Sequence, residues 1–225
     1  LHGELHLKMD EKLDEIRQRI LDSSHYTPPV PEGLNASLRP YQREGYHWIA
    51  RLNKWGAGAL LADDMGLGKT VQAITFFLLK KEEGASLVVA PASVVPNWKE
   101  EIERFAPELN VQILNFSANR KQTIEEAKAG DVIVVSYGIL LSIQEDITRK
   151  QWNVACLDEA HIIKNRGAKT SGAAMKIQAR NRVMLTGTPV QNHLGELWSL
   201  FQFVNPGMLG TYEHFSQKFI IPIEG

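Results

Sequence analysis

Residues 63–70 combine two glycines with a lysine and a threonine in an order that suits phosphate binding. They stand between an apolar run and a helical stretch, so the glycines would let backbone N–H groups approach phosphate oxygens. The start of the following helix adds partial positive charge. Lys69 would reach the outer phosphates of a nucleotide, and the Thr70 hydroxyl would bind Mg²⁺. Asp63 replaces the first glycine of the strict pattern, so an ordinary strand–helix turn stays open.

Two adjacent carboxylates, Asp158 and Glu159, follow a second apolar run at residues 154–157. Mg²⁺ keeps its water molecules and takes few protein ligands, so an aspartate at a strand end can hold a water of its shell. The next carboxylate is then placed to deprotonate an attacking water. We therefore predict that Asp158 serves the metal and that Glu159 is the general base. A helix N-cap followed by an acidic first turn is the alternative.

A third polar segment begins where the apolar run 183–186 ends. Small hydroxyl residues at a strand end can connect a phosphate site to a neighbouring surface, and Gly187 allows close backbone approach. A plain turn explains the same residues equally well, because threonine, glycine and proline are turn residues. This segment is therefore a candidate for coupling the phosphate site to a neighbouring surface, rather than for a catalytic role.

Short apolar runs alternate with helical stretches from residue 38 onward. The predicted strands are 59–62, 87–90, 111–115, 132–136, 154–157 and 183–186, and the predicted helices are 69–82, 97–105, 119–129, 138–147, 169–179 and 194–203. Several of the strands are apolar throughout, which is typical of strands covered on both faces. The alternation predicts a doubly wound, mainly parallel α/β sheet with helices on both faces, in three layers. Ligands bind such sheets at the carboxyl ends of the strands, where the polar segments stand.

Residues 1–33 form an N-terminal extension in this interpretation. Apolar residues recur at helical spacing over residues 4–22, which predicts an amphipathic helix before the α/β lobe. Pro28, Pro29 and Pro31 then predict a short extended linker. Residues 34–225 are predicted as the lobe itself. The chain begins with leucine rather than methionine, so we expect that it was cut from a longer protein.

The composition narrows the class of protein. The chain has 25 Lys and Arg against 26 Asp and Glu, for a net charge of −1. This balance argues against a generally basic nucleic-acid coat protein but allows a local track for phosphates. Cys156 is the one cysteine, which excludes an intrachain disulfide and a thiolate zinc cluster. With no signal peptide or membrane span visible, we expect an intracellular protein of the cytoplasm, nucleoid or nucleus that is not secreted.

The ordered set of motifs resembles the first RecA-like lobe of superfamily-two motors of the Swi/Snf-type, Rad-like DNA translocase family. In that family an aspartate is usual at the position of Asp63. The resemblance covers about residues 38–210 and rests on residues 38–42 (an adenine-reading glutamine motif), 62–70 (motif I), 89–93 with 97–98 (Ia), 135–137 (Ib), 158–161 with 163–165 (II), 185–192 (III), 196–200 and 205–207.

The resemblance implies ATP-driven movement along double-stranded DNA without full strand separation, with ATP and Mg²⁺ as cofactors. The nucleotide-binding residues that it implies are Arg39, Gln42, Met65, Gly66, Leu67, Gly68, Lys69 and Thr70. The DNA-backbone contacts that it implies are Ser93, Asn97, Ser136, Tyr137, Lys164 and Asn165. The coupling residues that it implies are His161, Thr186, Gly187, Thr188, Gln191 and Asn192. Helix capping by Ser93 and Ser136 and a merely solvated Lys164 stay open, and for Trp98 we favour packing over base stacking.

Motors of this family need a second RecA-like lobe that carries arginine fingers, which contribute about 10³–10⁵ in rate. The sequence shows no second set of strands and no glutamine-led arginine pair, so it reads as a first lobe only. We expect a monomer that is nearly inactive as an ATPase without its partner lobe. Two other interpretations remain: a lobe of an RNA-unwinding enzyme of the same superfamily, and a non-catalytic ATP-binding scaffold.

Overall fold

The fold is built on one sheet in which every strand runs parallel to its neighbours. The structure is a computed structural model that describes residues 2–64, 66–165, 167–187 and 193–224. Six strands pair in the order β1-β6-β5-β2-β4-β3. Their bounds are Ala59–Leu61 (β1), Ser86–Ala90 (β2), Asn110–Ile113 (β3), Asp131–Ser136 (β4), Gln151–Leu157 (β5) and Gln178–Leu185 (β6). All six predicted strands are present, although β5 and β6 begin earlier than the apolar runs indicated, and β3 ends at Ile113 because residues 114 and 115 lie in a 3-10 turn.

The central strands β2, β4 and β5 bury both of their faces, which explains why they read as continuous apolar runs. In β2, Val88 and Ala90 belong to one hydrophobic cluster, whereas Leu87 and Val89 belong to another on the opposite face. This two-residue alternation follows from the pleat of the strand. Two separate cores, one on each side of the sheet, confirm the predicted three-layer arrangement.

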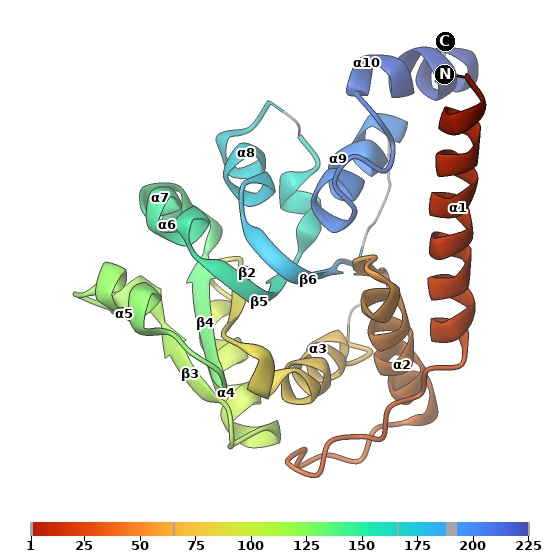
Figure 1. The fold of residues 1–225 in the computed structure, drawn as a ribbon. Coiled ribbons are helices and arrows are strands. Elements are labelled where there is room, and N and C mark those ends of the chain that lie inside the picture. The colour runs from red at the N-terminus through yellow and green to blue at the C-terminus, as the bar shows by residue number, and fades with distance from the viewer. Residues whose placement is uncertain (1, 65, 166, 188–192, 225) are drawn as a thin grey trace.

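Helices cover each face of the sheet (Figure 1). The buried apolar residues of three helices belong to the first core: α2 (Pro40–Trp55), α3 (Lys69–Leu79) and α4 (Val95–Phe105). Those of five others belong to the second: α5 (Arg120–Glu126), α6 (Tyr137–Ser142), α7 (Gln144–Arg149), α8 (Lys169–Met175) and α9 (Leu194–Val204). Short 3-10 turns stand at Lys81–Glu83, Leu114–Phe116 and Ala160–Ile163.

Several helices differ from the prediction. The sequence analysis did not predict α2. This helix begins at Pro40, and Gly45 interrupts its pattern of helix-favouring residues. The helix predicted over 138–147 is two helices, because Ile143 ends α6 and precedes α7. The chain ends in helical segments that were not predicted: α10 (Tyr212–Phe215), a π-helical turn (Ser216–Ile220) and α11 (Ile221–Glu224).

The N-terminal helix is confirmed as α1 (His2–Ser24), which stands along one side of the lobe and contacts α2 (Figure 1). Its apolar residues Leu13, Ile16 and Ile20 are exposed. The extended stretch that follows lies against the lobe, because the Tyr46 hydroxyl donates to the Pro29 carbonyl at 3.0 Å. No helix among the described residues is long and apolar enough to cross a membrane.

Candidate active site

The polar segments singled out in the sequence meet at one edge of the sheet. Because the strands are parallel, the residues after β1, β6, β5, β2 and β4 all leave the sheet at its carboxyl end. The loop before Lys69 follows β1, Thr186 follows β6, and Asp158 follows β5. The strand order makes these three elements neighbours.

The loop between β1 and α3 curls around the side chain of Lys69. Gly66 and Gly68 have φ angles of 83° and 74°, a left-handed conformation that glycine adopts without strain. The Lys69 ammonium donates to the carbonyls of Asp63 and Asp64 at 2.7 and 2.9 Å. Thr70 stands in the first turn of α3, with its side chain half-buried. Met65, another predicted nucleotide-binding residue, lies outside the described residues.

Gln42 of α2 joins the start of that helix to the glycine loop. Its Oε1 accepts from the Arg39 N–H at 3.0 Å, and its Nε2 donates to the Leu67 carbonyl at 3.3 Å. A Cβ on Gly68 would lie 2.4 Å from the same Nε2, so the contact needs glycine there. The structure thus brings Gln42 and the loop together, while the side chain of Arg39 is exposed.

Asp158 is almost buried, with 8% of its surface exposed. Its Oδ2 accepts from Trp98 Nε1 and its Oδ1 from the Glu159 N–H, both at 2.8 Å. Burial raises the pKa of Asp158 above its ordinary value, while these hydrogen bonds and the nearby Lys69 ammonium oppose the rise. The carboxylate therefore lies close to the phosphate loop and is held in a set orientation.

Glu159 has the left-handed backbone conformation, with φ 47° and ψ 51°, and is the only non-glycine among the described residues with positive φ. Such a conformation costs free energy, and it clusters at functional sites. Its Oε2 lies 3.1 Å from His161 Nδ1. Both side chains are partly exposed, so the carboxylate faces solvent at the strand edge. The two predicted catalytic carboxylates therefore differ in environment, because Asp158 is buried and Glu159 is accessible to solvent.

The predicted DNA-contact residues fall into two groups. Ser93, Asn97 and Asn165 are exposed, as a contact to a nucleic-acid backbone requires. Ser136 is buried and caps α6, since its hydroxyl accepts from the Ile139 N–H at 3.3 Å. For Ser136 the structure therefore favours the capping alternative over a DNA contact.

Tyr137 and Lys164 are engaged inside the protein rather than presented to solvent. Tyr137 is 6% exposed, and its hydroxyl donates to the Asp158 carbonyl at 2.8 Å. Lys164 lies 3.1 Å from the Glu196 carboxylate, with 11% of its side chain exposed. A side-chain contact to DNA does not fit the placement of Tyr137, and for Lys164 it competes with this ion pair. The alternative that Lys164 is merely a solvated surface lysine is therefore wrong.

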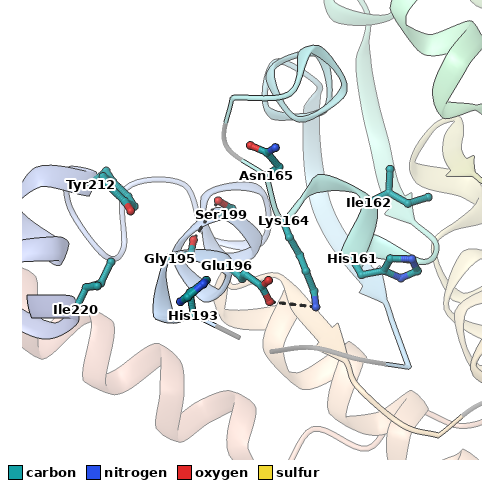
Figure 2. Close-up of a pocket in the computed structure, with 10 residues that line it drawn as sticks. All are labelled: His161, Ile162, Lys164, Asn165, His193, Gly195, Glu196, Ser199, Tyr212 and Ile220. Carbon is teal, nitrogen blue, oxygen red and sulfur yellow. Dashed lines mark hydrogen bonds and ion pairs between the residues drawn. The ribbon is translucent and has the colours of Figure 1, made fainter. Parts of the chain in front are cut away.

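A pocket of about 760 Å³ lies beside this ion pair (Figure 2). Figure 2 shows Lys164 and Glu196, two of the lining residues, pointing toward each other. Its walls come from the segment after Asp158, from the start of α9 and from the C-terminal helices. Its other lining residues are His161, Ile162, Asn165, His193, Gly195, Ser199, Tyr212 and Ile220.

The predicted coupling segment is described only at its start. Thr186 is buried, and its N–H donates to the Leu61 carbonyl at 3.1 Å, which ties the end of β6 to the end of β1. Gly187 follows it and is half-buried. Thr188, Gln191 and Asn192 lie outside the described residues.

The bond from Trp98 to Asp158 was missed by the sequence reasoning. Trp98 is fully buried against Phe77, with 6.1 Å between the ring centroids, which confirms packing rather than base stacking. Its partner is 60 residues away, and only the adjacency of β2 and β5 brings the two together. A buried tryptophan usually has a hydrogen-bond acceptor for its N–H, so the prediction that Trp98 is packed could have prompted a search for that acceptor.

Comparisons with known proteins agree with this geometry. Residues 41–225 match the family model described as SNF2-related domain. The Bacillus subtilis protein YwqA is 42% identical over 202 residues, which cover 87% of this chain and 22% of that protein. The TATA-binding protein-associated factor mot1 of Schizosaccharomyces pombe is 38% identical over 232 residues, which cover 95% of this chain and 12% of that protein. The chain thus spans less than a quarter of either relative.

A solved structure has the same fold. It is the Sulfolobus solfataricus SWI2/SNF2 ATPase core in complex with dsDNA, with a TM-score of 0.79 and 39% identity. The match covers 88% of this chain and 42% of that one. Together with the family match over residues 41–225, this shows that the chain has a RecA-like α/β fold and belongs to the SNF2-related family of ATPases.

Proposed function

We propose that this chain is the ATP-binding lobe of a motor that couples ATP hydrolysis to movement along double-stranded DNA, of the remodelling or recombination type. The observation that carries the proposal is the meeting of Lys69, Asp158 and Glu159 at neighbouring strand ends in a member of this family. Neither Lys69 nor Glu159 lies where a structural role alone would explain it. Within the described part of the chain, the Lys69 ammonium donates to the Asp63 and Asp64 carbonyls of the loop, and Glu159 has a left-handed backbone conformation.

In this proposal the loop after β1 binds the phosphates of ATP. Its glycines bring backbone N–H groups to the phosphate oxygens, and the N-terminus of α3 favours negative charge. The Lys69 ammonium would exchange its carbonyl partners for the outer phosphates. Gln42 of α2 donates from its amide to the Leu67 carbonyl of the same loop, and this amide would meet the base edge of the nucleotide.

The donor set at the strand ends suits Mg²⁺. No group of three or more His, Cys, Asp or Glu residues that could hold a metal stands among the described residues, so a cage made by protein alone is absent from this part of the chain. Mg²⁺ instead takes one or two protein ligands together with phosphate oxygens and waters. Asp158, through a water, and the Thr70 hydroxyl would hold it. Bound there, the ion would neutralise charge that develops on the phosphates.

Glu159 would act on the attacking water. Its carboxylate is partly exposed just after the end of β5, and His161 Nδ1 lies within hydrogen-bond reach of it. A positioned carboxylate that accepts a proton from water raises the rate of hydrolysis by about 10²–10⁴. His161, Thr186 and Gly187 are proposed to pass the state of this site to the neighbouring surface, as are Thr188, Gln191 and Asn192.

The DNA track is proposed to run over Ser93, Asn97 and Asn165. These side chains are exposed in segments that follow β2 and β5, and polar groups of this kind hold phosphates without reading sequence. The described similarity to an ATPase core in complex with dsDNA supports duplex DNA as the partner. Lys164 joins the track only if its ion pair with Glu196 opens.

A second RecA-like lobe of the same protein is proposed to complete the site. The chain spans 42% of the archaeal core that it matches, and that core is described as an ATPase. The second lobe would supply the arginines that stabilise charge in the transition state. We propose a monomeric motor that works inside the cell, on DNA of the nucleoid or nucleus.

The proposal is tested by asking whether a protein that contains this chain moves along duplex DNA without opening it. A third strand bound in the major groove of a duplex is displaced by a translocase, whereas the duplex strands stay paired. We expect ATP-dependent displacement of the third strand and no separation of the duplex. Separation of an RNA duplex without displacement of the third strand would instead favour the RNA-unwinding alternative.

A further inference from the structure

Asp158 is held at four points, two on its backbone and two on its carboxylate. Its N–H donates to the Val89 carbonyl at 2.8 Å, which extends the pairing of β5 with β2. Its carbonyl accepts from the Tyr137 hydroxyl, also at 2.8 Å. Its two carboxylate oxygens accept from Trp98 Nε1 and from the Glu159 N–H. Each oxygen retains room for a further acceptor bond, to a water for example.

The indole donor is itself immobilised. Trp98 lies in the first turn of α4, and only 1% of its surface is exposed. Its ring packs on Phe77 of α3, the helix that begins at Lys69 and Thr70. A fully packed side chain with two rotatable bonds keeps one rotamer. The N–H therefore points at one place, and that place is the carboxylate.

The phenol donor reaches the same residue from another strand. Tyr137 begins α6 directly after β4, and α6 is capped by Ser136. The Asn115 side chain accepts from the Ser136 N–H at 2.9 Å and so fixes this corner. The two donors thus enter from segments that follow β2 and β4, which flank each other in the sheet.

We propose that Trp98 and Tyr137 are positioning residues for Asp158, which orient its carboxylate for the Mg²⁺ that accompanies ATP. This inference rests on the proposed function, because it takes Asp158 as the metal-side carboxylate. Partners that orient a metal-side group typically change metal affinity or activity by about 10–100-fold when they are removed. Trp98 lies in the segment after β2, which also holds the DNA candidates Ser93 and Asn97, and Tyr137 lies in the segment after the neighbouring strand β4. Both donors therefore contact Asp158 from the side of the lobe on which the DNA track is proposed.

The test compares ATP binding by the 225-residue chain and its variants, with Mg²⁺ and with a chelator. Trp98→Phe keeps an aromatic ring but removes the N–H. We expect its affinity for ATP to fall about tenfold in Mg²⁺, while its affinity in the chelator stays within about twofold of the original chain. Tyr137→Phe should show the same pattern to a smaller extent.

Two matched variants separate positioning from loss of stability. Trp152 is also fully buried, and its indole donates to a backbone carbonyl, that of Ile147, at 3.0 Å. Tyr46 is also buried, with its hydroxyl on the Pro29 carbonyl. Trp152→Phe and Tyr46→Phe should lower the melting temperature comparably and leave the Mg²⁺ dependence unchanged.

The outcomes distinguish this inference from the proposed function. Tight Mg²⁺-dependent binding by both Trp98→Phe and Tyr137→Phe would overturn the inference and leave the function standing. An equal loss in Trp98→Phe and Trp152→Phe would overturn it too, since a general loss of stability would then explain both. Should Trp98→Phe fail to fold, Tyr137→Phe decides alone. An original chain whose ATP binding ignores Mg²⁺ would contradict the function and the inference together.

Discussion

Lys69 is the residue on which nucleotide binding depends most directly. We expect Lys69→Ala to weaken ATP binding at least about tenfold, because a hydrogen bond to a charged partner contributes about 1.5–3 kcal/mol. Calorimetry with ATP and Mg²⁺ measures this. Lys80→Ala is the matched control, because Lys80 follows the last turn of the same helix and pairs with Glu83. Equal affinities of the two variants would contradict the assignment of the phosphate loop.

A substitution of Glu159 should affect the hydrolysis of ATP without affecting its binding. In the protein that contains this chain, we expect Glu159→Gln to keep its affinity for ATP and to lose about 10²–10⁴ in the rate of hydrolysis. The amide cannot accept a proton from water, but it fills the same space. Glu103→Gln, on the exposed face of α4, should hydrolyse ATP normally. A Glu159→Gln variant that bound ATP poorly but turned it over would show that the roles of the two carboxylates are reversed.

At the scale of elements, the sequence predicted those parts whose pattern is local. The central strands were found because they bury both faces and are apolar throughout, and the helix after Lys69 was found because it is apolar. Helix α2 was not predicted, since Gly45 and several aromatic residues weaken its helical pattern. The contact of Trp98 with Asp158 and the pair Lys164–Glu196 depend on which strands and helices become neighbours. A single sequence does not specify that order through any local pattern.

The approach of α9 to the start of β1 depends on Gly58. A Cβ at this position would lie 2.3 Å from the Val204 carbonyl oxygen, a backbone atom that cannot rotate away. We expect Gly58→Ala to lower the free energy of unfolding by about 1–3 kcal/mol. Chemical denaturation measures the change.

Gly172 provides the contrast for that measurement. It lies inside α8, and nothing within 4 Å would meet an added Cβ. Since alanine is favoured over glycine in a helix by up to about 1 kcal/mol, Gly172→Ala should be neutral or stabilising. If Gly58→Ala proved as harmless as Gly172→Ala, the packing of α9 against β1 would differ from the one described.

At the scale of the whole molecule, the 225-residue chain should fold but do little chemistry. Two cores flank the six-stranded sheet of the described residues, which favours independent folding. Arginine fingers contribute about 10³–10⁵ in rate, so we expect the chain to hydrolyse ATP slower than the longer protein by a factor of that order. Turnover by the chain that matched the longer protein would contradict the need for a second lobe.

Duplex binding by the chain alone should be weak and without sequence preference. The net charge is −1, and the exposed DNA candidates are neutral side chains. Binding that rests on phosphate contacts weakens as salt rises, with a slope of about 0.9 for each phosphate neutralised. Two duplexes of unrelated sequence, titrated at several salt concentrations, should give the same affinities and the same shallow slope. A strong preference for one duplex would indicate contacts to the bases, which the proposed track of phosphate contacts does not include.

The central claim is that this lobe belongs to a motor that runs on duplex DNA. The most direct measurement is the ATPase rate of the protein that contains this chain, without nucleic acid, with duplex DNA and with RNA, beside the Glu159→Gln variant as the blank. The account predicts that duplex DNA raises the rate well above the basal value, that RNA does not, and that the variant shows no stimulated hydrolysis. Equal stimulation by RNA, or stimulated hydrolysis that survives Glu159→Gln, would contradict it.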